Sequence, residues 1–178
     1  MRMKIGKLGV VGYALFLANV LPGCSAEGGA PTGALKVSSP AFAEGAAIPQ
    51  KHACARMEGQ DVSPPLTWSG VPESASELAI VVNDSDARGG TYIHWIVTGI
   101  PVTATGASEG QAPGQVLPGT NSAAAYSGPC PSSGEHHYHF IVYALKSPIE
   151  PNGSAKAVHE QIKAAAITSA ETVGTWKR

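Results

Sequence analysis

The chain has 178 residues, with 12 lysines and arginines, 13 aspartates and glutamates, and a net charge of −1 when its histidines are neutral. This length is typical of one domain with a single hydrophobic core. Because the charges are balanced and no basic stripe occurs, the composition excludes a protein that binds nucleic acid through a cationic surface.

Residues 1–23 predict a bacterial lipoprotein signal peptide. Three basic residues precede an apolar run from Leu8 to Leu21 that is too short and too interrupted to span a bilayer. The segment Leu21-Pro22-Gly23-Cys24 resembles a lipobox. We therefore expect Cys24 to be the acylated first residue of the mature protein, which anchors it to a membrane.

The predicted lipid anchor places the protein in the cell envelope. Ser25 stands after Cys24 in place of an aspartate, which by resemblance to Gram-negative sorting rules favours the periplasmic face of the outer membrane. An ordinary signal peptide is the alternative, and it would give a secreted or periplasmic soluble protein. Cleavage before Cys24 removes three basic residues and no acid, so the net charge falls from −1 to −4. Residues 24–34 predict a flexible tether, and residues 35–178 predict the folded domain.

Short runs of branched and aromatic residues, separated by glycine and proline, predict a mainly β fold. One segment predicts a helix, because Ser154 can cap it and Val158, Ile162 and Ala166 recur at helical spacing. The connection 103–125 is rich in glycine, alanine and proline and predicts an irregular surface loop. The expected strands lie near residues 35–39, 66–68, 77–82, 91–100, 138–145 and 172–176.

Polar residues gather at or near the ends of three expected strands. Asp84 and Asp86 follow the first of these, His94 lies in the second, and His136 and Tyr138 open the third. Side chains at strand ends can converge on one pocket, so these five residues predict a shared site.

Alternation along a strand assigns faces to the residues around the two histidines. It predicts that His94 shares a face with Tyr92 and lies opposite Trp95. It also predicts that His136 shares a face with Tyr138.

Five short motifs follow one another in register: Ser63-Pro64-Pro65-Leu66-Thr67-Trp68, Asp84-Ser85-Asp86-Ala87-Arg88, His94-Trp95, Gly128-Pro129-Cys130-Pro131 and His136-His137-Tyr138. They resemble the phosphatidylethanolamine-binding protein family, specifically its bacterial Raf-kinase-inhibitor-like branch. The resemblance covers roughly residues 35–178. It implies an antiparallel β-sandwich with one or a few peripheral helices, and a pocket for ligand binding.

Three residues depart from the family pattern. Ser85 and Arg88 stand where the family usually has prolines, and His137 stands where it usually has arginine. Arg88 either attracts an anionic ligand to the pocket mouth or neutralises Asp84 and Asp86.

The predicted function is non-enzymatic binding of a small anion, a phosphate or carboxylate group. Imidazoles, a phenol and a backbone amide near Gly128 are donors suited to such a ligand, and a carboxylate can orient an imidazole. We predict no cofactor, no metal and no catalytic residue. The predicted ligand-binding residues are Asp84, Asp86, His94, Gly128, Pro129, His136 and Tyr138.

Four alternatives stand beside this interpretation. The protein could regulate or inhibit a kinase or peptidase through protein contact. The His137 and His139 pair with the two aspartates could bind zinc, although no familiar ligand spacing occurs. A His-Asp pair could act as a general base, although no nucleophile motif supports catalysis. Finally, the polar residues could form a buried network that only holds loops together.

The remaining residues of interest have structural interpretations. Cys54 and Cys130 are an even pair in an oxidising compartment and favour a disulfide, with two separate thiols as the alternative. His52 and His159 are expected to be core or surface residues, and Asp61 a solvated loop charge.

Overall fold

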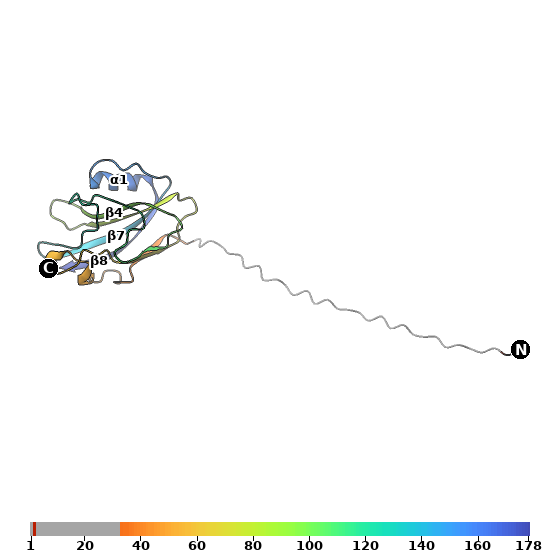
Figure 1. Cartoon of the computed structure of the whole chain (residues 1–178), viewed down its shortest axis with the longest axis horizontal. Coiled ribbons are helices and arrows are strands. Elements are labelled where there is room, and N and C mark those ends of the chain that lie inside the picture. The colour runs from red at the N-terminus through yellow and green to blue at the C-terminus, as the bar shows by residue number, and fades with distance from the viewer. Residues whose placement is uncertain (1, 3–32) are drawn as a thin grey trace.

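The computed structural model describes Arg2 and residues 33–178 (Figure 1). Apart from Arg2, the predicted signal peptide lies outside the described residues, as do Cys24 and nearly all of the predicted tether. In the described part, no helix is long and apolar enough to cross a membrane.

Two antiparallel sheets form the domain. The smaller sheet has the order β1-β2-β5 and the larger the order β6-β4-β3-β7-β8. This confirms the mainly β, antiparallel two-sheet prediction. The strands are β1 (Lys36–Ser38), β2 (Leu66–Ser69), β3 (Glu77–Asp84), β4 (Tyr92–Ile100), β5 (Gly106–Ala107), β6 (Gln115–Leu117), β7 (Glu135–Leu145) and β8 (Ala166–Lys177).

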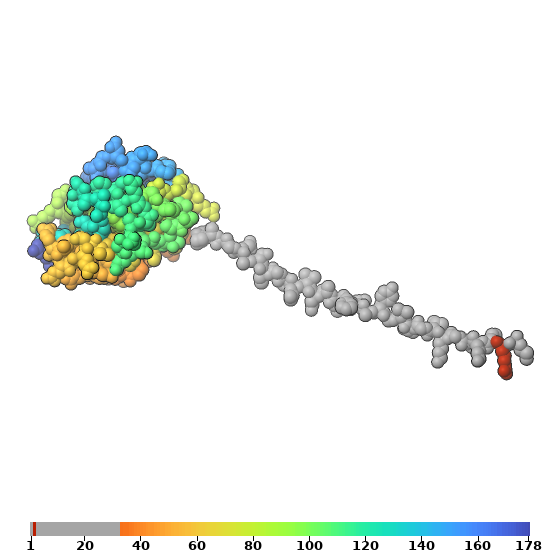
Figure 2. Space-filling model, viewed as in Figure 1, coloured from red at the N-terminus to blue at the C-terminus, as the bar shows by residue number. Residues whose placement is uncertain are grey.

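Hydrophobic residues cover both faces of the larger sheet. Along β3, Ile80 and Val82 face the core between the two sheets, whereas Ala79 and Val81 face a second core under helix α1 (Ala155–Ala165). Figure 1 shows α1 on one side of the larger sheet, and Figure 2 shows the same segment at the surface of the domain. Because both faces are buried, β3 reads as a continuous apolar run and not as an alternating one.

Helix α1 forms where the sequence predicts it. The Ser154 hydroxyl accepts a hydrogen bond from the Ala157 backbone N–H at 3.3 Å, which satisfies one of the free donors of the first turn. Val158 and Ile162 are buried in the second core. Ala166, however, lies outside the helix and begins β8.

The sequence analysis missed part of the β structure. The segment 103–125 contains β5 and β6, which pair with β2 and β4 and are therefore not irregular loop. The last strand begins at Ala166 and not near residue 172, and it pairs along its length with β7. Its residues 166–171 are mostly small or polar, so their strand conformation depends on this pairing more than on local propensity.

A β-bulge interrupts the pairing of β3 with β4 at His94. Val82 pairs with Trp95 and the next residue, Asn83, pairs with Ile93, so that His94 has no partner on β3. A bulge places two residues of one strand opposite one residue of its neighbour and shifts the alternation of faces. As a result, Trp95 joins the core between the sheets and His94 lines a cavity at the end of that core. The prediction that His94 and Trp95 lie on opposite faces is therefore wrong.

Cys54 and Cys130 form the predicted disulfide, with their Cα atoms 5.5 Å apart and a separation of 76 positions in sequence. Cys54 lies between two short 3-10 helices, Gln50–His52 and Ala55–Met57. Its backbone N–H also donates to the carbonyl oxygen of Pro129 at 3.0 Å. The bridge therefore ties the 3-10 segment to the Pro129 loop.

Removing this disulfide should lower the free energy of unfolding by about 2–4 kcal/mol, because the bridge closes a long loop in the unfolded chain. Urea denaturation of wild type and of the double variant Cys54→Ser/Cys130→Ser measures the difference. A reductant should destabilise the wild type and leave the double variant unchanged. Equal midpoints for the two oxidised proteins would contradict the prediction.

Candidate anion-binding site

A cavity of about 250 Å³ lies where β3 ends and β4 and β7 begin. Asp84, His94 and His136, which are far apart in sequence, all line it. The register brings them together, because Asp84 pairs with Tyr92 of β4 on one side and with Tyr138 of β7 on the other. Arg56 and Arg88 also line the cavity.

Asp84 is the buried centre of this arrangement, with 4% of its surface exposed. The Nδ1 atom of His136 donates to its Oδ2 at 2.7 Å, since an ionised carboxylate can only accept. The backbone N–H of Asp86 donates to its Oδ1 at 2.8 Å. Asp84 therefore fixes the orientation of the His136 ring and leaves its Nε2 atom as the free nitrogen.

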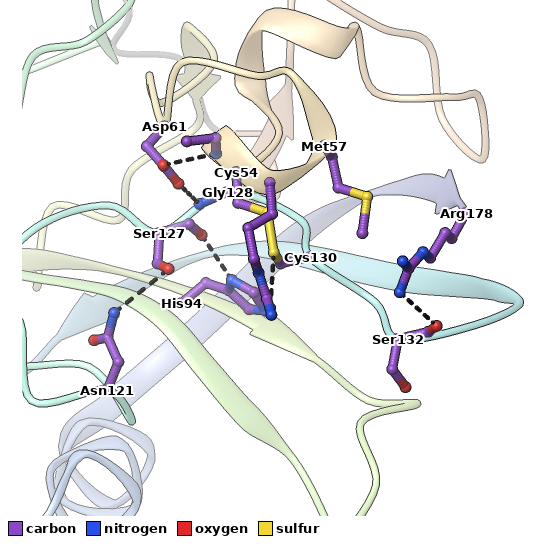
Figure 3. The surroundings of a disulfide bond; sticks show 12 residues. Cys54, Met57, Asp61, His94, Asn121, Ser127, Gly128, Cys130, Ser132 and Arg178 are labelled. Carbon is purple, nitrogen blue, oxygen red and sulfur yellow. Dashed lines mark hydrogen bonds between the residues drawn. A yellow bond between two sulfur atoms is a disulfide. The ribbon is translucent and has the colours of Figure 1, made fainter.

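His94 is held in one tautomer by the backbone. Its Nδ1 atom lies 2.6 Å from the carbonyl oxygen of Ser127, so Nδ1 carries the proton and donates (Figure 3). Burial lowers the pKa of His94, an effect that the neighbouring Ser127 carbonyl and Asp84 oppose. The neutral ring then presents Nε2 as an acceptor, and it can donate to a ligand only after protonation. This differs from the prediction that His94 acts as a donor.

Tyr138 lies behind the histidines in the core. Its side chain is 1% exposed, and its ring packs edge-on against His94 with centroids 5.3 Å apart. Its hydroxyl is buried and makes no hydrogen bond to a described residue, although the backbone of Cys130 faces it. Burial, and then the charge of Asp84, raise its pKa. Tyr138 supports the His94 ring and does not line the cavity.

Asp86 belongs to a separate exposed pair. Its Oδ2 atom accepts from both the backbone N–H and the Nδ1 atom of His137, each at 2.8 Å. Hydrogen bonding from His137 lowers the pKa of the Asp86 carboxyl. Asp86 was predicted to shape the pocket, but it does not line the cavity. Asp86 lies in the turn after β3, which ends at Asp84, and its carboxylate is held there by His137.

Gly128 and Pro129 were also predicted to bind the ligand, but neither residue lines the cavity. The Gly128 N–H donates to the Asp61 carboxylate at 2.8 Å, so it is not free to bind an anion as predicted (Figure 3). A Cβ atom at position 128 would come within 2.4 Å of the carbonyl oxygen of His52. Glycine is therefore needed here for close backbone packing and not for approach of a ligand.

Asp61 is an organising residue that the sequence analysis treated as a solvated charge. Besides Gly128, its carboxylate accepts from the Ala55 backbone N–H at 3.1 Å. Asp61 thus joins the 3-10 segment to the loop that carries the disulfide cysteine Cys130. The sequence around Asp61 gave no local signal of this role. One of its partners, Gly128, is distant in sequence, and the other, Ala55, lies in an irregular segment.

Two arginines at the cavity form no ion pair with an acidic residue of the described part of the chain. Arg88 forms no ion pair with a described carboxylate, so the structure does not favour the alternative in which it neutralises Asp84 and Asp86. Arg56 was not predicted. Its Nη2 atom donates to the Sγ atom of Cys130 at 3.3 Å. The signal that could have revealed Arg56 is its place two residues after Cys54, because the bridge brings that segment to Cys130.

Comparison with known proteins identifies the family. The family model described as phosphatidylethanolamine-binding protein matches residues 38–177. The chain belongs to the phosphatidylethanolamine-binding protein family. It is 42% identical over 149 residues to "Putative lipoprotein LppC" of Mycobacterium tuberculosis, covering 80% of this chain and 72% of the relative.

Other members of the family extend the likeness. A UPF0098 protein of Methanothermobacter thermautotrophicus is 34% identical over 153 residues, which is 81% of this chain and 99% of that protein. The crystal structure of Escherichia coli YbcL, described as a member of the mammalian family, superposes with a TM-score of 0.75 at 32% identity. That match covers 81% of this chain and 98% of YbcL.

The described histidines and acids can be compared with the alternative zinc site. Within residues 33–178, no three His, Cys, Asp or Glu side chains lie together in a way that could hold a metal ion. His139, a member of the alternative zinc pair, instead bonds to Glu171 through Nδ1 and to Ser85 through Nε2.

Replacing Asp61 should loosen the loop beside the cavity. Asp61→Ala removes the acceptor for two backbone N–H groups, so we expect it to lower the free energy of unfolding by about 1–3 kcal/mol. Asp61→Asn keeps one acceptor and should lose less. Denaturant midpoints measure both effects, with Glu135→Ala as a control for loss of an exposed acid. No difference between Asp61→Ala and this control would refute the role.

Three buried histidines should make stability fall in acid. Burial lowers the pKa of His52, His94 and His159 below 6.5, for His159 to about 4. The unfolded chain then binds more protons than the folded one. The free energy of unfolding should therefore decrease as the pH drops through 6.5 and go on decreasing toward pH 4.

Urea midpoints measured across this range test the assignment. The variant His159→Gln should show a shallower decrease than the wild type, because it removes one of the three groups. An unchanged slope would mean that His159 does not titrate as its surroundings indicate.

Proposed function

We propose that this protein is a non-enzymatic binding protein that holds a small anion, a phosphate or carboxylate group, in the cavity lined by Asp84, His94 and His136. The observation that carries the proposal is an excess of unpaired positive charge beside a carboxylate that is already paired. Arg56 and Arg88 line the cavity and form no ion pair within residues 33–178, while Asp84 is occupied by His136.

The donor set favours a phosphate-bearing ligand over a carboxylate. A guanidinium is planar and always charged, and it bonds phosphate oxygens in pairs. The Nε2 atom of His136 faces the same space and donates when that ring is charged. Neutral His94 can accept a hydrogen bond from a protonated phosphate oxygen. These groups together suit a ligand that offers several acceptors and one hydroxyl.

The size and walls of the cavity suit a small headgroup. Its volume of about 250 Å³ is below the range of about 300–1,000 Å³ that drug-sized ligands need. Tyr92, Ala87 and Pro131 add apolar surface beside the charged groups. A phosphate with a short organic substituent would use both kinds of surface.

The proposed location complements such a ligand. The mycobacterial relative is named as a putative lipoprotein, which supports an envelope location for this chain and acylation at Cys24. A lipid anchor followed by a tether of about ten residues keeps the domain close to a membrane surface. Phospholipid headgroups are then a nearby source of phosphate groups, and soluble phosphate esters are the other source.

The proposal predicts thermal stabilisation by phosphate. The free energy gained from a few charged hydrogen bonds is partly offset by the cost of association, which leaves a dissociation constant on the order of 1 mM. A hundredfold excess of ligand over that value stabilises the folded state by about 2.7 kcal/mol. The melting temperature should therefore rise with phosphate and not with sodium chloride at matched ionic strength.

Variants locate the effect. His136→Ala and the double variant Arg56→Gln/Arg88→Gln should each weaken phosphate binding at least about tenfold, since charged hydrogen bonds are lost. His139→Ala, on the opposite face of the same strand, is the matched control and should bind as the wild type does. Wild-type affinity in the cavity variants would remove the proposed role. Purification with a stoichiometric kinase or peptidase, and no phosphate response, would favour the regulatory alternative.

A further inference from the structure

A second cavity, of about 240 Å³, lies on the opposite face of the larger sheet, against α1. Successive side chains along a strand point to opposite faces of the sheet, so the same strands can line both cavities. Asn83 lines the second cavity and the adjacent Asp84 lines the first. The arrangement places the two cavities back to back, separated by the thickness of one sheet.

Asn83 contributes a buried amide without a protein partner. Only 6% of the residue is exposed, and it projects from the same face of β3 as Ala79 and Val81, which pack under α1. Its side-chain amide forms no hydrogen bond with a described residue, and it is not among the fully enclosed unpaired atoms. A buried amide without a hydrogen-bond partner destabilises the folded protein. Because Asn83 lines the cavity, the N–H and the oxygen of its amide are both available to a ligand there.

His159 contributes a second buried polar atom. The residue is 5% exposed and its Nε2 atom lies 2.8 Å from the hydroxyl of Tyr143. Burial, and then the charge of Lys163, lower its pKa to about 4, so the ring is neutral near pH 7. Its other ring nitrogen, Nδ1, makes no hydrogen bond with a described residue. By contrast, both nitrogens of the neighbouring His139 are occupied.

One unpaired cation stands at the rim. Lys156, His159, Glu160 and Lys163 follow one another at helical spacing and line one side of the cavity. Lys163 is paired with Glu160 at 3.0 Å, whereas Lys156 forms no ion pair with a described residue. Ile93 and Ile141 supply apolar surface between the rim and the buried amide. The net unpaired charge of the lining is therefore a single positive charge.

We propose that this second cavity is a binding site for a small aliphatic monocarboxylate that carries a hydroxyl or similar neutral polar group at its far end. The carboxylate pairs with Lys156 at the rim, the carbon chain lies along Ile93 and Ile141, and the polar group bonds to Asn83 and His159. The single unpaired cation selects a monoanion, whereas the first cavity, with two unpaired guanidiniums, selects a more highly charged ligand.

Titration of γ-hydroxybutyrate into the isotopically labelled full chain, followed by nuclear magnetic resonance, tests the site. Saturable shifts should appear in the Asn83 side-chain amide and in the α1 backbone. Butyrate lacks the polar end and butanol lacks the charge, so each should bind more weakly. Shifts that do not saturate, or equal binding of all three compounds, would overturn the proposal.

Two variants and a control separate binding from folding. Asn83→Leu should weaken binding about tenfold, as expected for loss of a buried hydrogen bond. Lys156→Gln changes only an exposed side chain and should weaken binding about two- to fivefold, as for an exposed ion pair. Lys146→Gln removes an exposed lysine that does not line this cavity and should have no effect. Unchanged affinity in Lys156→Gln would sink the proposal even if Asn83→Leu did not fold.

Discussion

The register of β3 between β4 and β7 is the constraint on which the first cavity depends. It sets Asp84 level with Tyr92 on one side and Tyr138 on the other, so that His136, two residues before Tyr138, can reach the carboxylate. A shift of one residue would turn every side chain of β3 to the opposite face and separate this pair. The buried cores on both faces of the sheet prevent such a shift, because each requires its own set of apolar residues.

The loops around the cavity are fixed by a different set of contacts. The Cys54–Cys130 bridge and the two hydrogen bonds of Asp61 join the 3-10 segment to the loop at residues 127–131. These contacts place the Ser127 carbonyl against His94 and bring Arg56 to the cavity. The loop residues therefore act mainly by positioning other groups, and the charged groups that face the cavity come from the strands and the two arginines.

One sheet lines two cavities because consecutive strand residues point in opposite directions. Asn83 and Asp84 differ in burial only slightly, yet one faces α1 and the other faces the end of the inter-sheet core. The first cavity carries strong charges and suits a phosphate. The second carries neutral buried groups with one rim cation. The two cavities share β3, β4 and β7, so a change in the backbone at Asn83-Asp84 alters the lining of both cavities.

The sequence by itself determined the main elements and three of the residues that line the first cavity, Asp84, His94 and His136. Apolar runs, the Ser154 cap and the motif order were enough to predict the main strands, the helix and the pairing of Cys54 with Cys130, because these depend on local pattern or on cysteine count. Tertiary structure alone decided the bulge at His94, the turn of Asp86 toward His137, the use of the Gly128 amide by Asp61, and the arrival of Arg56. Each of these features depends on strand register or on contact between residues distant in the chain. The periodicity of a single segment encodes neither the register nor such contacts.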